Sequence, residues 1–233
     1  MGLKSGLKKA RGFAISLAYT VLQKRGVVND FHVLYYDSHK LGKTWADTRW
    51  LGVTAKKCPL DLWNYQEIIF ETKPDLIIEC GTSLGGSALF LASICDLVGK
   101  GRVVSIDVEE RTGRPKHSRI TYLLGSSTSE EVVAEVKRFI KKGHRVMAVL
   151  DSDHCKQHVL KELMIYSKLV TKRSYLVVED TNLNGHPVEP GFGPGPMEAL
   201  EEFLRENKDF SVDKAREKFY LTFNPRGYLR RVR

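Results

Sequence analysis

Acidic residues follow four of the five apolar runs that the sequence predicts as parallel strands. Glu79 ends the first run, Asp107 the second and Asp151 the fourth, and Glu179 with Asp180 follows the fifth. Because the carboxyl ends of parallel strands meet at one edge of a sheet, we expect these carboxylates to lie close together. Such an edge indicates a ligand that is cationic, rich in hydroxyl groups or metallic.

The acids of the fourth and fifth runs could hold a metal ion. Asp151, Glu179 and Asp180 offer the hard oxygen ligands that Mg²⁺ or Ca²⁺ takes, and Asp153 is an alternative first ligand. The competing interpretation is an acid cluster neutralised by nearby Lys and Arg side chains. We expect Mg²⁺ or another hard divalent cation, since bound Mg²⁺ keeps sites open where oxygens of a substrate can displace water.

His154, three residues after Asp151, could act as a general base. A bound cation would lower the pKa of a substrate hydroxyl, and a histidine can accept the released proton near neutral pH. A lone histidine is more often a structural hydrogen-bonding group, so this role depends on the position of His154 alone.

A turn of small residues follows the first acid and leads into an apolar helix. Glycines let the backbone approach a ligand, and the start of the helix offers free N–H groups. An ordinary strand-to-helix turn is the alternative. The candidate cofactor-binding residues of this turn are Glu79, Gly81, Thr82, Ser83, Gly85 and Ser87.

Asp107 lies 22 residues after Gly85, close to the offset of about 20 residues at which a ribose-binding acid follows a glycine loop. The loop pattern is E-x-G-x-x-x-G-G and not the G-x-G-x-x-G of a dinucleotide site. A carboxylate at this turn, Glu79, suits a cofactor without phosphates and with a positive centre, such as S-adenosylmethionine. The pattern therefore favours methyl transfer over hydride transfer.

Apolar strands alternate with helices along most of the chain. This order predicts an α/β fold with a mostly parallel sheet covered on both faces. We expect a helix that Asp61 caps, a long loop over the acidic edge, and a C-terminal antiparallel hairpin around residues 224–227. The other predicted strands are 76–78, 103–106, 119–123, 145–150 and 174–178, and the predicted helices include 130–142, 156–170 and one that begins at Pro196.

Composition is that of a soluble globular chain, with 233 residues, 42% hydrophobic and 28% charged. The net charge of +9 is concentrated at the ends, and residues 1–25 carry six basic side chains and no acid. Known nucleic-acid-binding motifs are absent, so we expect no nucleic-acid partner. We expect a basic leader closed by Gly26 and an irregular aromatic lid or substrate wall within residues 1–60, followed by a catalytic domain over 61–233.

The apolar run 13–22 is shorter than the roughly 20 residues needed to span a bilayer, and it has no signal-peptide cleavage pattern. The four cysteines show no C-x-x-C spacing, which fits reduced thiols. We therefore expect a cytoplasmic protein. Peripheral membrane association through the basic leader is an open alternative.

The run IIECGTSLGGSALFLA, followed by SIDVE, LLGSS, VLDSDH and VVEDTN, resembles the class I S-adenosylmethionine-dependent methyltransferases. Within them the chain is similar to the cephalosporin hydroxylase family, which includes rhamnosyl O-methyltransferase-type proteins. The resemblance extends from about Trp45 to FNPRGYLRR near the C-terminus. VLDSDH and VVEDTN are its most specific motifs.

This resemblance implies a seven-stranded Rossmann-like sheet and a general base at His154. It implies a divalent metal on Asp151, Glu179 and Asp180, with Asp151 also next to the cofactor. The residues that it places around the cofactor are Glu79, Gly81, Ser83, Asp107, Ser126 and Ser127.

The resulting hypothesis is an S-adenosylmethionine- and Mg²⁺-dependent O-methyltransferase that acts on a hydroxyl of a sugar, glycolipid or natural product, as a homo-oligomer. A second hypothesis is an iron oxygenase in which His154, Asp153 and His158 form a site of two histidines and one carboxylate. A third is a non-enzymatic module that docks on a membrane or an anionic glycan.

Overall fold

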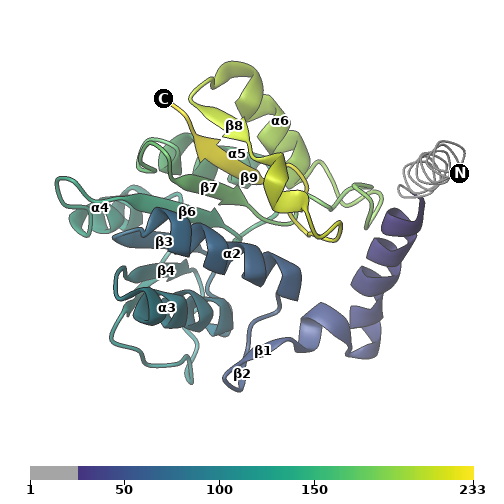
Figure 1. Cartoon of the computed structure of the whole chain (residues 1–233), viewed down its shortest axis with the longest axis horizontal. Coiled ribbons are helices and arrows are strands. Elements are labelled where there is room, and N and C mark those ends of the chain that lie inside the picture. Colours follow the sequence, from purple (N-terminus) through teal and green to yellow (C-terminus); the bar gives the residue numbers. More distant parts are fainter. Residues whose placement is uncertain (1–25) are drawn as a thin grey trace, which may run out of the picture.

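The computed structural model describes residues 26–233, and a seven-stranded sheet runs through their centre (Figure 1). Its strand order is β5-β4-β3-β6-β7-β9-β8; the first five of these strands are parallel, and β9 runs antiparallel to β7 and β8. The expected α/β fold with a mostly parallel seven-stranded sheet is confirmed. The strands are β3 (Leu76–Cys80), β4 (Val103–Asp107), β5 (Ile120–Leu124), β6 (Val146–Leu150), β7 (Tyr175–Val178), β8 (Phe210–Val212) and β9 (Tyr228–Arg231).

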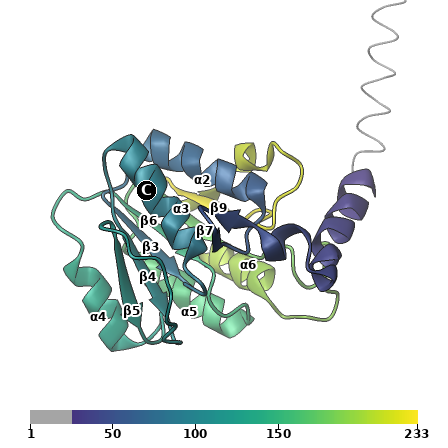
Figure 2. The ribbon, with the colours of Figure 1, turned by 90° about the horizontal axis from the view of Figure 1, so that it is seen from below.

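Helices cover both faces of the sheet, as Figures 1 and 2 show. The apolar sides of α2 and α3 pack on one face, and those of α4, α5 and α6 pack on the other. The predicted helices 130–142 and 156–170 end earlier than expected. The helices are α2 (Pro59–Thr72), α3 (Gly86–Val98), α4 (Glu130–Arg138), α5 (Lys156–Tyr166) and α6 (Pro196–Glu206).

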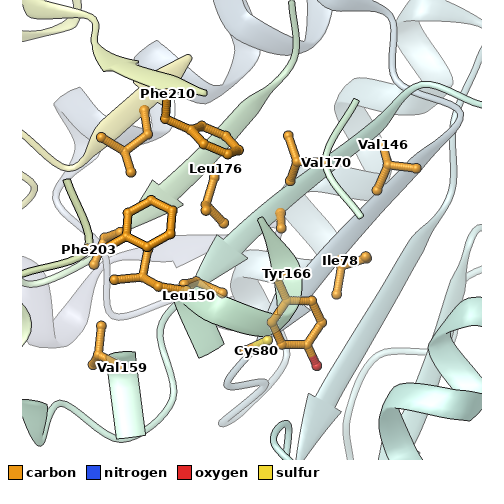
Figure 3. Close-up of a cluster of buried hydrophobic side chains, with 14 of the residues drawn as sticks. Ile78, Cys80, Val146, Leu150, Val159, Tyr166, Val170, Leu176, Phe203 and Phe210 are labelled. Atoms are coloured by element: carbon orange, nitrogen blue, oxygen red, sulfur yellow. The ribbon is translucent and has the colours of Figure 1, made fainter. Parts of the chain in front are cut away.

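The core that carries the site lies between the sheet and the helices α5 and α6 (Figure 3). Every residue of β3, β6 and β7 is buried, which explains why these strands show no polar alternation. Phe203 and Tyr166 fill the space above Leu176 and Cys80 and are at most 1% exposed. At about 1.5–3 kcal/mol for each large buried apolar side chain, this packing fixes the strand ends with respect to one another.

Asp61 does not cap α2 as predicted. The helix begins at Pro59, and Asp61 lies in its first turn, 1% exposed. The carboxylate accepts hydrogen bonds from the Tyr228 hydroxyl at 2.7 Å and from the Phe223 backbone N–H at 2.8 Å. Asp61 therefore ties α2 to the C-terminal segment.

The antiparallel end of the sheet is confirmed, but the predicted position of the hairpin is wrong. The partner of β9 is β8, and η3 (Lys214–Glu217) lies between them. Residues 218–223, which the apolar pattern favoured as a strand, are irregular. The reason is that the backbone around Phe223 turns inward to meet Asp61 and leaves no free edge for ladder pairing.

The N-terminal described segment contains more regular structure than expected. Residues 26–37 are helical, and the predicted leader over residues 1–25 lies outside the described residues. This helix lies beside the body of the domain in both ribbon views. It leads into η1 (Ser38–Leu41), η2 (Thr44–Asp47), β1 (Arg49–Trp50) and β2 (Val53–Thr54).

No helix within residues 26–233 combines the length and the apolar character needed to cross a bilayer.

Candidate active site

The carboxyl ends of β3, β4, β6 and β7 lie in a row, so the predicted acids share one edge of the sheet. Backbone hydrogen bonds continue past the ends of the strands. The Asp151 N–H donates to the carbonyl oxygen of Cys80 at 2.8 Å, and the Glu179 N–H donates to the carbonyl oxygen of Leu150 at 2.9 Å. The order in which the strands are added to the sheet changes direction at β3, since β4 lies on one side of β3 and β6 lies on the other. This is the switch point at which open α/β sheets bind ligands.

Gly81 lets the turn after β3 pass close to the end of β6. Its φ is +96°, and a Cβ there would lie 1.8 Å from the carbonyl oxygen of Asp151. Any larger residue would push the two strand ends apart. The predicted glycine turn is therefore required by a close backbone approach.

Two cavities meet at this edge. The first, of about 450 Å³, includes Asp107 and His158 in its wall. The second, of about 360 Å³, includes Tyr36 and His154. Ligands held in the two cavities would therefore face each other across a shared wall, which consists of Gly81, Ser83, Asp151 and Ser152.

The structure distributes the predicted cofactor residues over these cavities. Thr82 and Ser87 line the second cavity. Gly85 lines neither cavity and packs instead against Pro115, whose Cδ would lie 2.8 Å from a Cβ on this glycine. The residues found in the wall of the first cavity are Gly81, Ser83, Asp107, Ser126, Ser127 and Asp151.

Asp107 sits at the mouth of the first cavity in a fixed orientation. Its Oδ2 accepts the backbone N–H of Ser83 at 2.7 Å and its Oδ1 that of Glu109 at 2.9 Å. The Arg114 guanidinium pairs with Oδ2 at 3.0 Å. A carboxylate offers about four acceptor positions, and these three contacts leave one of them, on Oδ1, for a ribose hydroxyl.

Glu79 is not brought to either cavity. Its carboxylate is 1% exposed and accepts hydrogen bonds from the hydroxyls of Ser105, at 2.5 Å, and Ser87. Burial raises the pKa of Glu79 to about 7, and the two hydroxyls oppose the shift. The residue expected to face a positive cofactor is instead an internal support of the glycine turn.

Lys57 lies among the acids of the second cavity and was not anticipated from the sequence. Its ammonium group pairs with Asp151 and, at 2.6 Å, with Glu179, and the side chain is 6% exposed. The other oxygen of Glu179 accepts the Tyr65 hydroxyl at 2.5 Å. Burial lowers the pKa of Lys57, but the two carboxylates outweigh it, so the pKa is raised overall and the side chain is charged.

Asp151, His154 and Asp180 form the one group within residues 26–233 whose candidate ligand atoms lie within 4.8 Å of one another. The His154 Nε2 is 3.3 Å from Oδ2 of Asp180. Burial raises the pKa of both Asp151 and Asp180, as expected for carboxylates crowded together at the end of a sheet. Added positive charge would stabilise their ionised forms.

Asp153 lies on the other side of the shared wall. It lines the first cavity, and its Oδ1 accepts the backbone N–H of Cys155 at 2.7 Å. Of the two alternatives for the first metal ligand, the geometry therefore favours Asp151.

This donor set fits Mg²⁺. Mg²⁺ takes oxygen ligands and is commonly held by one or two carboxylates while it keeps several waters. Asp151 and Asp180 provide those carboxylates at the wall of an open cavity. The imidazole of His154 is a poor ligand for so hard an ion and is left beside the pair.

The iron-oxygenase alternative is not favoured, because its three ligands do not converge. His154 lines the second cavity, whereas Asp153 and His158 line the first. The Nε2 of His158 is 3.1 Å from the Ser127 hydroxyl and 3.4 Å from Glu162. A hydrogen bond to Glu162 raises the pKa of His158.

Glu162 is a second residue that the sequence interpretation missed. It is fully buried on α5, where one carboxylate oxygen accepts the hydroxyls of Ser127 at 2.5 Å and Ser152 at 2.7 Å. It therefore joins the loops after β5 and β6. A signal was present, since Glu162 falls in the inward stripe with Val159 and Leu163, where a charge needs partners.

Comparison with known proteins agrees with this fold. A structure of CmcI-N160 without ligands has a TM-score of 0.64 at 20% identity and covers 81% of this chain and 77% of that chain. A structure of CmcI-D160 with Mg and SAM has a TM-score of 0.62 at 20% identity, covering 81% and 78%. The strand order is that of the class I methyltransferase fold.

Sequence comparison gives the family. The family model described as rhamnosyl O-methyltransferase/CmcI matches residues 42–232. A rhamnosyl O-methyltransferase of Mycobacterium leprae (strain TN) is 40% identical over 210 residues, which cover 87% of this chain and 90% of that protein. One of Mycobacterium tuberculosis (strain H37Rv) is 38% identical over 225 residues, covering 93% and 89%. The chain belongs to the rhamnosyl O-methyltransferase/CmcI family, and the expected enzyme class, an O-methyltransferase, is confirmed.

Proposed function

We propose that this protein transfers the methyl group of S-adenosylmethionine to a hydroxyl of a sugar that is part of a larger molecule, with Mg²⁺ as the second cofactor. The observation that carries the proposal is the pair of cavities that share Asp151, one suited to a ribose and the other lined by acids and a histidine. The relatives named rhamnosyl O-methyltransferase support a sugar as the acceptor. The protein CmcI has been solved with Mg and SAM, which supports the choice of cofactors.

Each side of the shared wall has its own task. Asp107 accepts a ribose hydroxyl, and the loop that carries Ser126 and Ser127 lines the first cavity around the cofactor. Asp151 and Asp180 would hold Mg²⁺, and Glu179, which pairs with Lys57, is the third carboxylate of the predicted set. When bound, Mg²⁺ supplies positive charge that lowers the pKa of a coordinated hydroxyl.

His154 completes this arrangement as the general base. Its ring is oriented by the contact between Nε2 and Asp180, so the other ring nitrogen, Nδ1, would take the proton of the acceptor hydroxyl while the oxygen attacks the methyl group. Because Gly81, Ser83, Asp151 and Ser152 line both cavities, the proposal places the acceptor oxygen and the methyl carbon on either side of these residues. No residue of the chain needs to form a covalent intermediate.

Calorimetry with S-adenosylmethionine tests the proposal. We expect binding by the native protein, loss of binding in Asp107→Ala, and unchanged binding after chelation with EDTA, which should abolish turnover. His154→Gln should bind S-adenosylmethionine normally and lower kcat by about 10²- to 10⁴-fold. Absence of any binding heat in the native protein would contradict the proposal.

We further propose that the enzyme contacts an anionic lipid surface through its N-terminal segment. Val27, Phe31 and Leu34 recur at helical spacing within the helix 26–37, Leu41 follows in η1, and these four side chains are 51–73% exposed. Residues 1–25, which precede them, carry six basic side chains and no acid. An apolar stripe next to a basic segment is the combination that binds anionic bilayers.

Co-sedimentation with phosphatidylglycerol vesicles tests this contact. The double variant Phe31→Ser, Leu34→Ser should lose most vesicle binding, whereas Leu97→Ser, which is even more exposed but lies at the end of α3, should keep it. Unchanged binding by the double variant would contradict the proposal. If this variant instead dissociates an oligomer in analytical ultracentrifugation, the stripe is a subunit interface of the expected homo-oligomer.

A further inference from the structure

The second cavity has two chemically different ends. One end carries the acids and His154 described above. The other is apolar and aromatic, formed by Trp45, Leu183, Phe192 and Phe223. Tyr36 also lines this cavity. Polar groups are thus gathered at the reacting end of the cavity.

The aromatic end is rigidly built. The rings of Tyr36 and Trp45 stack with centroids 5.4 Å apart. Trp45 and Phe223 form an edge-to-face pair with centroids 5.9 Å apart. The Trp45 indole N–H donates to the backbone carbonyl of Tyr36 at 3.0 Å. His32 stacks on Phe223 with centroids 5.6 Å apart. The wall is therefore preformed, and a ligand need not order it on binding.

Phe192 lies at the mouth of the cavity, on the loop between β7 and α6, and is 44% exposed. Hydrogen bonds hold this loop: Gly193 N–H donates to the Asn184 side chain at 3.1 Å, and that side chain donates to Glu198 at 3.0 Å. Glu198 also accepts the N–H of Gly195 at 2.6 Å. The loop therefore presents Phe192 in a defined position.

A pyranose ring matches these two ends. Its C–H groups give one apolar face, which packs well against aromatic rings, while its hydroxyls point outward around the ring. A sugar with its apolar face against the aromatic end would direct hydroxyls toward His154 and Asp180. A fully polar ligand would gain nothing from the aromatic end, because groups that lose water there find no hydrogen-bond partner.

We propose that Trp45, Phe192 and Phe223 form the acceptor subsite and pack against the apolar face of the sugar, and that Tyr36 positions the ring by a hydrogen bond from its phenol. This inference rests on the proposed function. No hydrogen bond joins the Tyr36 hydroxyl to another residue of the segment 26–233, so it is available to a ligand. The aromatic segment predicted as a substrate wall thereby acquires a specific role.

The decisive variant is Phe192→Ala, chosen because a partly exposed side chain can be removed without unfolding the domain. With p-nitrophenyl α-L-rhamnopyranoside as acceptor, we expect KM to rise about tenfold, equivalent to about 1.4 kcal/mol, with kcat changed less than twofold. The calorimetric Kd for S-adenosylmethionine should not change. Phe70→Ala, on the exposed side of α2, is the matched control and should leave KM unchanged.

Trp45 and Tyr36 give a second, independent series. Trp45→Phe keeps an aromatic surface and should retain acceptor binding, while Trp45→Ala should lose it; thermal unfolding shows whether each variant is folded. Tyr36→Phe keeps the ring and should raise KM about fivefold through the lost hydrogen bond. Saturation-transfer NMR with the same glycoside and S-adenosylhomocysteine measures acceptor contact without turnover.

The outcomes separate this inference from the proposed function. If the native protein binds S-adenosylmethionine but neither binds nor methylates the glycoside, the sugar-directed function fails and the subsite with it. If the native protein methylates the glycoside while Phe192→Ala and folded Trp45→Ala keep its KM, the function stands and the subsite is wrong. A KM increase confined to these variants supports the subsite.

Discussion

Lys57 shows that the two competing interpretations of the acid cluster describe the same site. Its ammonium group neutralises Asp151 and Glu179, as expected of a structural cluster. Asp180 nevertheless stays next to Asp151 and His154, with an open cavity in front of them. The cluster is therefore only partly compensated, and one further cation remains to be accommodated.

This arrangement leads to a prediction for Lys57→Met. Removing the ammonium group leaves two buried carboxylates facing each other, so the free energy of unfolding in EDTA should fall by about 3 kcal/mol. Mg²⁺ replaces the lost charge, so saturating Mg²⁺ should stabilise the variant more than the native protein. Urea unfolding with EDTA and with Mg²⁺ measures both quantities.

Lys56→Met is the matched control, because Lys56 is the neighbouring residue and is exposed. It should change the free energy of unfolding by less than about 0.5 kcal/mol in either condition. Equal stabilisation of native protein and Lys57→Met by Mg²⁺ would show that Lys57 and the metal do not interact.

Among single residues, those placed at strand ends were predictable and their partners were not. Asp107 and Asp151 follow apolar runs, and their location depends on local sequence alone. Lys57 reaches Asp151 across 94 positions of sequence, through a segment without periodicity. Glu79 has the same local signal as Asp107, yet its side chain alternates to the buried side of the strand end.

At the level of elements, the site depends on how closely the turn after β3 approaches the end of β6. Gly81→Ala would place a methyl group 1.8 Å from the Asp151 carbonyl oxygen, at a φ that already disfavours alanine. We expect the free energy of unfolding to fall by about 3 kcal/mol or more and S-adenosylmethionine binding to be lost, because both cavities share this wall.

Gly113→Ala separates the effect of the close contact with Asp151 from the effect of placing alanine at a positive φ. Gly113 also has a positive φ, of +86°, but a Cβ there would meet nothing within 4 Å. Gly113→Ala should lower the free energy of unfolding by about 1 kcal/mol and leave S-adenosylmethionine binding unchanged. Similar losses in the two variants, measured by urea unfolding and calorimetry, would show that the close approach is not what holds the site together.

The helices and strands could be predicted from the sequence wherever the spacing of apolar residues matched the side chains that are buried in the fold. All five parallel strands lie where apolar runs predicted them; β3, β4, β6 and β7 are almost entirely buried, whereas the edge strand β5 is only partly buried. The segment 218–223 has the composition of a strand, but tertiary hydrogen bonds to Asp61 override that preference. Such long-range competition leaves no trace in local sequence.

The whole molecule balances buried acids of opposite pH dependence. Burial raises the pKa of Asp61, in the first turn of α2, and of Glu79, near the end of β3, to about 7. Burial also acts on Glu198, but the hydrogen bonds from Gly195, His186 and Asn184 outweigh it and lower its pKa to about 2. The first two groups favour the folded state at low pH, and the third favours it at neutral pH.

Glu79 allows this balance to be measured. Its pKa is about 7 in the folded state against 4.5 in the unfolded state, so between these values the folded protein keeps a proton that the unfolded chain releases. The free energy of unfolding should therefore fall by up to about 3 kcal/mol as the pH rises from 4.5 to 7, and then level off. Glu79→Gln mimics the protonated carboxyl and should remove this slope.

Urea unfolding at pH 5, 6, 7 and 8 compares the native protein with Glu79→Gln and with Glu110→Gln, an exposed control in the loop after β4. The difference between native protein and Glu79→Gln should grow in favour of the variant up to pH 7, while the control follows the native curve. Parallel curves for all three proteins would mean that Glu79 is ionised in the folded state. An ionised Glu79 would need a positive partner, and the positive cofactor next to the glycine turn would then be its candidate.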